Sequence, residues 1–303
     1  TDYIHSKGLK AGIYTSPGPT ACGGCTGSYG YEAKDAERFV EWGFDFLKYD
    51  WCSYTKIAKD MNSVAELRKP YEVMRDELKK AKRDMVFNLC QYGMGSVWEW
   101  GAEVGGNSWR TNRDIGMPGD MGASIFHIGF GQNGLEKWAG PGHWNDPDYL
   151  LLGILTSWKG GMAPTELTPD EQYAYVSLWS ILASPLIMGG DVAQLDEFTL
   201  NLLCNDEVIE VDQDPLGRQG HRVAQGEDIE IWSRDLEDGS LAVGLFNTGD
   251  FVKDITVHWT DLGLQGKRIV RDLWRQKDLG EFDRAFKAKV NPRGVVFVRI
   301  YRK

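Results

Sequence analysis

Residues 42–50 read Trp-Gly-Phe-Asp-Phe-Leu-Lys-Tyr-Asp, and this stretch decides the fold class. Gly43 ends a predicted helix over residues 32–42, because glycine readily adopts the left-handed backbone that closes a helix. The run that follows predicts a strand over residues 44–50 that finishes on polar side chains. A helix that leads into such a strand is typical of one unit of a parallel α/β sheet.

The same alternation extends to both sides of this stretch. Predicted strands cover residues 10–15, 44–50, 85–90, 108–111, 142–148 and 185–190, and predicted helices cover residues 32–42, 64–83, 95–104, 122–138, 168–183 and 198–203. Polar residues gather where several strands end, as they do at the active face of a (β/α)₈ TIM barrel. A doubly wound sheet is the alternative, but no glycine-rich phosphate loop follows any strand.

Six parallel strands do not close a barrel of this kind. Either two further strands escape the sequence pattern or the chain lacks its beginning. Because the chain starts abruptly at Thr1, we expect the first two strands to lie upstream of it. After about Gly217 the pattern changes to strands of period two, separated by turn signals, which predicts an antiparallel β domain. The expected domains are a catalytic barrel, incomplete at its N-terminus, over residues 1–217 and a β domain over residues 218–303.

Charge and hydropathy exclude two classes of partner. The net charge of the 303 residues is −10, and an acidic surface repels phosphate backbones, so we expect no nucleic acid. The apolar stretch over residues 176–190 is too short to span a bilayer and contains Pro185, so we expect no membrane insertion. The absence of any N-x-S/T sequon favours a bacterial source. Self-association into a homo-oligomer is left open.

Two carboxylates follow predicted strands. Lys48 and Asp50 are two residues apart and so project to the same side of their strand. An ammonium group beside a carboxylate keeps it ionised, which suits a nucleophile, although a structural salt bridge would give the same pattern. Asp114 comes just after the strand that carries Arg110, whose fork can hold a substrate oxygen. With Asp50 it would supply the pair of carboxylates that glycoside hydrolysis needs, and a structural Arg/Asp turn is the alternative.

Other motifs have a structural reading beside the functional one. Residues 143–148, His-Trp-Asn-Asp-Pro-Asp, are either a turn or a polar wall of a sugar pocket. The Cys-x-x-Cys motif at residues 22–25 lies in a Gly/Pro/Thr loop and has no second ligand pair, so we expect neither zinc nor any other metal. A disulfide from this loop to Cys52 is the more plausible role. The five histidines are not clustered, which argues against histidine-based catalysis.

Read together, these segments resemble glycoside hydrolase family 27, the α-galactosidases. The stretches that carry the resemblance are residues 8–14, 42–50, 108–111 with 114–115, and 139–148, and it extends over residues 184–190 and 205–217. The resemblance implies a (β/α)₈ barrel followed by an antiparallel β-sandwich. It also implies a retaining exo-α-galactosidase that acts on an α-galactoside substrate without a cofactor.

The same resemblance implies roles for particular residues. It implies that Asp50 is the nucleophile and Asp114 the acid/base, and that Cys22 pairs with Cys52 in a disulfide, which predicts an exported protein, periplasmic or extracellular. Sugar-contacting positions fall on Tyr14, Lys48, Arg110 and Asp148. Cys90 and Tyr92 fall in the loop that separates galactose from N-acetylgalactosamine, where a bulky Tyr92 favours galactose.

The chain also departs from the family pattern. Tyr149 stands where a Met is usual, Cys25 is an additional cysteine, and the loop after Asp114 reads Gly-Met-Pro-Gly. Three related activities therefore stay open: a β-L-arabinopyranosidase, an α-N-acetylgalactosaminidase and an isomalto-oligosaccharide enzyme. An inactive sugar-binding fragment is the alternative from another class, although both carboxylates are present.

Overall fold

The structure is a computed structural model that describes residues 1–116, 121–156 and 161–301. The chain divides into two compact units. The first comprises residues 1–113 and 142–146, and the second comprises residues 114–141 and 147–303.

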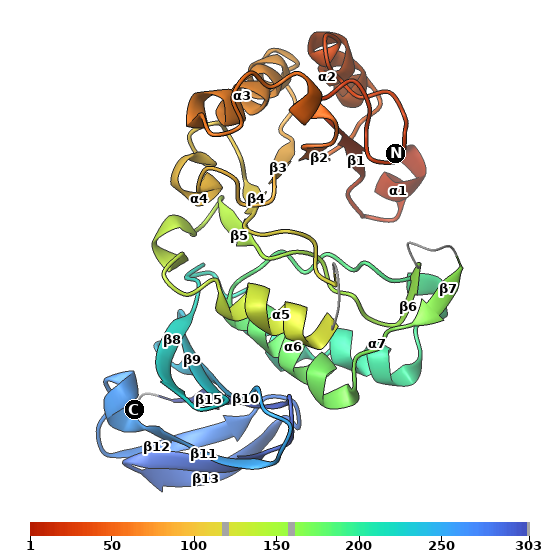
Figure 1. Cartoon of the computed structure of the whole chain (residues 1–303). Coiled ribbons are helices and arrows are strands. Elements are labelled where there is room, and N and C mark those ends of the chain that lie inside the picture. The colour runs from red at the N-terminus through yellow and green to blue at the C-terminus, as the bar shows by residue number, and fades with distance from the viewer. Residues whose placement is uncertain (117–120, 157–160, 302–303) are drawn as a thin grey trace. The chain divides into compact units, whose positions relative to one another are not determined.

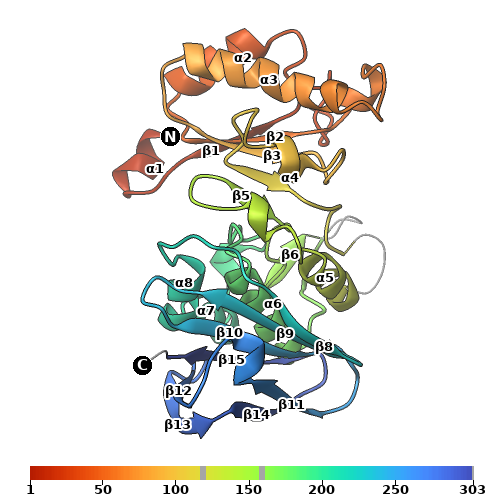
Figure 2. The same ribbon diagram turned by 90° about the vertical axis from the view of Figure 1, so that its left-hand side faces the viewer.

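A five-stranded parallel sheet forms the centre of the first unit (Figures 1 and 2). Its strands follow in chain order: β1 (Gly12–Thr15), β2 (Phe46–Asp50), β3 (Val86–Cys90), β4 (Ser108–Arg110) and β5 (Trp144–Asp146). The helices are α1 (Asp2–Ser6), α2 (Glu32–Glu41), α3 (Val64–Lys80) and α4 (Val97–Trp100), with a short 3₁₀ turn at Tyr54–Lys56. From the strand at residues 10–15 onward, the predicted order of strands and helices is thus confirmed for this unit, whereas α1 was not predicted.

Strand β2 is buried against the helices through every second residue. Leu47 and Tyr49 have no exposed surface, and the Tyr49 ring lies 5.9 Å from both Tyr71 of α3 and Phe87 of β3. Since side chains alternate across a strand, Lys48 and Asp50 project to the face away from these helices. The same alternation that builds the core therefore presents the candidate catalytic residues.

The amino end of β2 is held by a carboxylate with several partners. Asp45 accepts hydrogen bonds from the Ala11 backbone N–H at 2.9 Å, from Arg83 at 2.8 Å and from His5 at 2.7 Å. The backbone N–H of Ala11, followed by His5 and Arg83, lowers the pKa of Asp45 well below its usual range. These bonds join α1, β1, β2 and the start of β3 at the end of the sheet opposite to Asp50.

The second unit begins with helices. They are α5 (Met121–Phe130), α6 (Pro169–Ile181), α7 (Glu197–Leu203) and α8 (Asp206–Asp212), with 3₁₀ turns at Glu136–Trp138 and Val192–Gln194 and a hairpin of β6 (Ile154–Thr156) and β7 (Met162–Pro164). The predicted capping box is present: Thr168 and Glu171 satisfy each other's backbone N–H at the start of α6.

Two predictions in this region were wrong. The helix expected over residues 122–138 ends at Phe130, and Gly134, with φ of 90°, lies before a separate 3₁₀ turn. The strand expected over residues 185–190 is reduced to a single parallel bridge between Leu150 and Met188. Gly189 and Gly190 end this segment, and glycine weakens a strand because it has no side chain to pack.

Antiparallel strands complete the second unit. They are β8 (His221–Gly226), β9 (Ile229–Asp235), β10 (Leu241–Asn247), β11 (Lys253–His258), β12 (Lys267–Asp272), β13 (Lys277–Asp283), β14 (Ala285–Val290) and β15 (Val295–Ile300), with a 3₁₀ turn at Trp259–Leu262. Six form one sheet in the order β13-β12-β15-β10-β9-β8, and β11 pairs with β14 in a second sheet. Ile231, Val257 and Phe286 belong to one buried cluster shared by both sheets, as in a β-sandwich.

Strand β10 is buried on both faces. Val243 and Leu245 join the sandwich core, whereas Ala242 and Phe246 join a separate cluster with helix α6. Gly244 lies on the helix side, where an added Cβ would come 2.4 Å from Phe246 and 2.8 Å from Ile181. The close approach of α6 to the sheet therefore requires glycine at this position.

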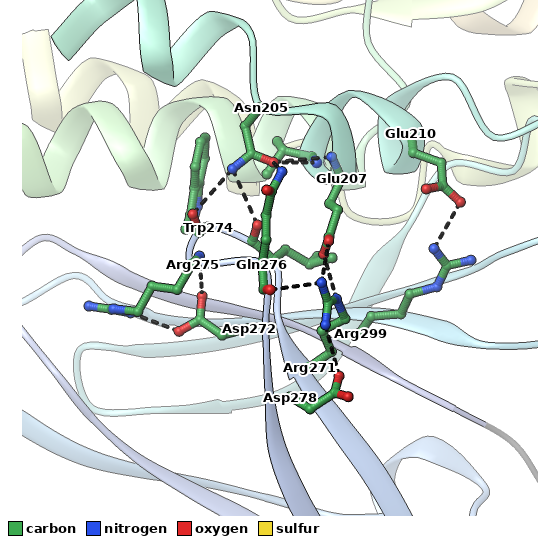
Figure 3. Close-up of polar contacts among 12 residues, drawn as sticks. Asn205, Glu207, Glu210, Arg271, Asp272, Trp274, Arg275, Gln276, Asp278 and Arg299 are labelled. Atoms are coloured by element: carbon green, nitrogen blue, oxygen red, sulfur yellow. Dashed lines mark hydrogen bonds and ion pairs between the residues drawn. The ribbon is translucent and has the colours of Figure 1, made fainter.

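Polar contacts join α8 to the sheet beneath it (Figure 3). Asn205 caps α8 and donates to the backbone oxygens of Leu273 and Trp274. Arg271 of β12 makes a two-pronged pair with Glu207, at 2.9 and 2.6 Å, and Arg299 of β15 pairs with Glu210 at 2.9 Å. The domain division at residues 217 and 218 stays a prediction.

Within the described ranges of the chain, no helix has the length and apolar character needed to cross a membrane.

We predict that Gly244→Ala lowers the free energy of unfolding by about 1–3 kcal/mol, because a methyl group has no room between β10 and α6. Urea denaturation measures the change. Gly226→Ala is the matched control, since an added Cβ on Gly226, at the end of β8, meets Ile229 at an ordinary 3.6 Å. Equal stability of the two variants would contradict the packing argument.

A buried arginine makes a second close contact in this unit. Arg234 of β9 is 1% exposed and donates to the backbone oxygens of Ser180 and Asp212, at 2.6 and 3.2 Å. Burial raises the pKa of the Asp212 carboxyl to about 7, although the charge of Arg234 opposes the shift. Burial likewise lowers the pKa of Arg234 to about 10.

This shift predicts a pH dependence of stability. Because the pKa of Asp212 is about 7 in the folded state and about 3.9 in the unfolded chain, the folded state binds the proton more tightly. The contribution of Asp212 to stability is therefore fully present below about pH 4 and is lost as the pH rises toward 7. Asp212→Asn does not titrate, so its stability should decline less than that of the wild type between pH 5 and pH 8 in urea titrations. Parallel curves would refute the prediction.

Candidate active site

Parallel pairing brings the ends of the strands in the first unit together. In the register, Tyr14 lies opposite Lys48 and Asp50 lies opposite Cys90. The carboxyl ends of parallel strands meet at one edge of the sheet, which is where α/β enzymes build their sites.

Asp50 accepts three hydrogen bonds at this edge. It is 5% exposed. Its Oδ1 accepts from the Tyr92 hydroxyl and from the Trp51 backbone N–H, both at 2.7 Å, and its Oδ2 accepts from the Tyr14 hydroxyl at 2.9 Å. Three donors on two oxygens fix the orientation of the carboxylate and stabilise its negative charge. Burial and the charge of Asp50 in turn raise the pKa of Tyr14, so its hydroxyl stays a donor.

The loop after β3 carries Tyr92 in an unusual backbone conformation. Tyr92 has φ of 64°, a region that side chains other than glycine rarely adopt. Gly93 follows with φ of 79°, and an added Cβ there would lie 2.2 Å from the backbone oxygen of Thr111. The Arg110 guanidinium lies 5.7 Å from the centre of the Tyr92 ring. This tightly coiled loop directs the Tyr92 hydroxyl onto Asp50.

Several charges surround the buried Cys90. Arg110 Nη1 lies 3.8 Å from its Sγ. The ammonium group of Lys48, on the neighbouring strand, lies 6.0 Å from the centre of the Tyr14 ring. Burial, and then the negative charge of Asp50, raises the pKa of the Cys90 thiol, whereas Lys48 and Arg110 oppose the shift. The structure therefore brings six of the predicted site residues together at one edge of one sheet: Tyr14, Lys48, Asp50, Cys90, Tyr92 and Arg110.

A polar group beneath this edge was missed as part of the candidate site. Asn88 of β3 donates to Ser108 at 2.7 Å and to the Asp146 carboxylate at 3.1 Å, and the residues are almost fully buried. A lone asparagine inside the apolar strand Met-Val-Phe-Asn-Leu-Cys was a usable signal, because a buried amide needs partners. It lies two residues before Cys90 and so on the same side of the strand.

The disulfide implied by the resemblance is present. Cys22 is bonded to Cys52, which ties the loop after β1 to the segment just after Asp50. Tyr14 Oη lies 3.2 Å from Cys52 Sγ, so the disulfide also touches the tyrosine that donates to Asp50. Ser16 adds a hydrogen bond to the backbone oxygen of Cys52.

Asp114 and Asp148 belong to the second unit, whereas Asp50 belongs to the first. Asp148 is 1% exposed, and its carboxylate accepts from the backbone N–H groups of Ile115 and Tyr149, each at 2.9 Å. The Gly-Met-Pro-Gly sequence that follows Asp114 falls at residues 116–119, of which residues 117–119 lie outside the described residues. The sugar-contacting role of Asp148 stays a prediction.

One group of residues has the spacing of a metal site. Within the described part of the chain, the ligand atoms of Cys22, Asp50 and Cys52 lie within 4.8 Å of one another. Both sulfurs are used in the disulfide and cannot act as thiolate ligands. The expectations of no metal and no cofactor stay predictions.

Comparison with known proteins gives concordant results. A family model described as alpha galactosidase A matches residues 1–214, and one described as the alpha galactosidase C-terminal β-sandwich domain matches residues 226–300. α-Galactosidase 2 of Arabidopsis thaliana is 36% identical over 306 residues, which covers 100% of this chain and 72% of the plant protein. α-Galactosidase A of Cellvibrio japonicus is 39% identical, with 86% of this chain and 61% of that protein covered.

Solved structures agree with the sequence matches. The structure of α-galactosidase I from Mortierella vinacea superposes with a TM-score of 0.85 at 31% identity, covering 100% of this chain and 79% of that one. A GH27 β-L-arabinopyranosidase from Geobacillus stearothermophilus also gives 0.85, at 25% identity, covering 99% and 76%. The predicted fold class, a (β/α)₈ barrel domain followed by a β-sandwich, is confirmed by these matches.

The cysteine environments predict a test of the site. Cys25 and Cys204 are exposed, whereas Cys90 is buried and its pKa is raised. Since the thiolate is the reactive form, Ellman's reagent should label Cys25 and Cys204 in the native protein and Cys90 only after unfolding without reductant. Cys90→Ser is the control, because it should remove only the denaturant-dependent signal. Rapid labelling of Cys90 in the native protein would contradict the described burial.

Proposed function

The chain belongs to the α-galactosidase family of glycoside hydrolases, and from that membership we propose that it removes terminal α-linked galactose with retention of anomeric configuration. The observation that carries the proposal is the Asp50 carboxylate, held at a strand end by two tyrosine hydroxyls and one backbone N–H. A retaining glycosidase needs such a fixed carboxylate as its nucleophile.

In the proposed first step, a carboxylate oxygen of Asp50 attacks the anomeric carbon and the bond to the leaving oxygen breaks. Asp114 donates its proton to that oxygen, and a covalent galactosyl-enzyme ester remains. In the second step, Asp114 takes a proton from water, which attacks the anomeric carbon and frees Asp50. The assignment of Asp114 is supported by its place in the motif that carries Arg110.

The side chains around Asp50 supply binding and orientation in this proposal. Lys48 and Arg110 are cations whose charges, like that of Asp50, act on the Cys90 thiol, and they suit sugar hydroxyls as donors. Tyr14 and Tyr92 keep the nucleophile in place by holding one oxygen each. The bulky Tyr92, in the loop that follows Cys90, supports the preference for galactose over N-acetylgalactosamine.

The cellular setting is a further part of the proposal. A structural disulfide persists in oxidising compartments, so Cys22–Cys52 supports an exported protein. A bacterial source and the absence of nucleic acid stay predictions from composition, and the oligomeric state stays open.

We predict that Asp50→Asn lowers kcat for p-nitrophenyl α-D-galactopyranoside by at least about 1,000-fold, because an amide is a poor nucleophile. The assay follows release of p-nitrophenol by the full-length protein, and circular dichroism checks the fold. Asp76→Asn is the matched control, since Asp76 is an exposed residue of α3 that pairs with its neighbour Arg75.

Two outcomes would overturn the proposal. An Asp50→Asn variant with most of its rate would remove the nucleophile assignment. If the wild type does not hydrolyse p-nitrophenyl α-D-galactopyranoside, α-galactosides are excluded as its substrate. The same assay with the β-L-arabinopyranoside and the α-N-acetylgalactosaminide then separates the related activities.

A further inference from the structure

The Asp148 carboxylate is engaged by the backbone on both of its oxygens. Oδ2 accepts from the Ile115 N–H and Oδ1 from the Tyr149 N–H, each at 2.9 Å, and the residue is 1% exposed. Charge-assisted bonds of this kind are among the stronger hydrogen bonds in proteins. A carboxylate used in this way holds two chain segments, residues 114–116 and 148–149, in one arrangement.

The backbone of Asp148 is also fixed from other directions. Its φ is 105°, a strained conformation for a residue with a side chain. The indole N–H of Trp179 in α6 donates to its backbone oxygen at 2.7 Å, and the Tyr175 hydroxyl donates to the backbone oxygen of Tyr149. Both rings are fully buried. Strain persists where the surroundings over-determine a conformation, and it is common at functional sites.

The segment that Asp148 holds begins at Asp114. The Ile115 side chain is 2% exposed and belongs to the buried cluster of the second unit, and the Gly116 N–H donates to Ser124 at 3.0 Å. The two residues that directly follow Asp114 are thus fixed by one buried side chain and two hydrogen bonds from their backbone. We infer that Asp148 is a positioning residue for Asp114, anchoring the backbone that carries the acid/base; this rests on the proposed function.

The inference has a kinetic signature that a structural role lacks. A general acid must lie within hydrogen-bond reach of the leaving oxygen, and small displacements reduce its effect steeply. Poor leaving groups need the proton most, whereas p-nitrophenolate leaves with little help. Loss of the anchor should therefore affect alkyl galactosides more than aryl galactosides.

The experiment compares Asp148→Asn and Asp148→Ala with the wild type in the full-length protein. We expect the fall in kcat/KM to be about 10- to 100-fold greater for methyl α-D-galactopyranoside than for p-nitrophenyl α-D-galactopyranoside, because loss of a contact to the shared galactose lowers both values alike and cancels in the ratio. Added azide should raise kcat of the variants on the aryl substrate and give galactosyl azide, because an anionic nucleophile needs no base.

Tyr175→Phe is the matched control, since it removes a hydrogen bond to Tyr149 and leaves the Ile115 bond in place. It should lower the melting temperature without preference between the two substrates. If the Asp148 variants do not fold, Ser124→Ala decides, because it removes the neighbouring bond to Gly116 and should show the same preference more weakly.

The outcomes separate the two proposals. Equal losses on both substrates, with no response to azide, would overturn the positioning role of Asp148 while leaving the galactosidase activity intact. A wild type that hydrolyses neither substrate would overturn the proposed function and this inference with it.

Discussion

The register of the parallel sheet is the constraint on which the candidate site depends. Tyr14 lies opposite Lys48 and Asp50 lies opposite Cys90, so four side chains reach one edge of the sheet together. Because strand side chains alternate with period two, a slip of one residue would turn Asp50 toward the helices and Tyr49 away from them. The fully buried Tyr49, packed against Tyr71 and Phe87, opposes that slip. The core of the first unit thus fixes which residues can do chemistry.

Backbone conformations that few side chains tolerate occur next to the proposed chemistry. Tyr92 in the first unit and Asp148 in the second both have positive φ values, and buried partners surround each of them. In the first case the conformation directs a hydroxyl onto Asp50, and in the second it directs a carboxylate onto the chain beside Asp114. The stability of the surrounding packing offsets the cost of these conformations.

In the second unit, the β-sandwich and the helices share one strand. Because β10 is buried on both faces, the helix α6 and the sandwich core cannot be packed independently. Gly244 permits the close approach, and Arg271, Asn205 and Arg299 add polar contacts along α8. The β-sandwich therefore supports the helix whose Trp179 holds the backbone of Asp148.

Local pattern in the sequence was sufficient for several features. The strand that ends at Asp50, the capping box at Thr168 and the order of helices and strands in the first unit follow from periodicity and from capping chemistry, which act over a few residues. Motif resemblance gave the Cys22–Cys52 disulfide. Where local signals were weak, as over residues 185–190 and around Gly134, the predicted element was too long.

What the sequence determined by itself is therefore the class of fold, the candidate carboxylates and the family to which the chain belongs. Tertiary structure alone decided the partners of those carboxylates: the hydroxyls of Tyr14 and Tyr92 on Asp50, 36 and 42 residues away, and the N–H of Ile115 on Asp148, 33 residues away. Hydrogen bonds act over about 3 Å, and neither spacing nor composition says which residues, distant in the chain, will come that close.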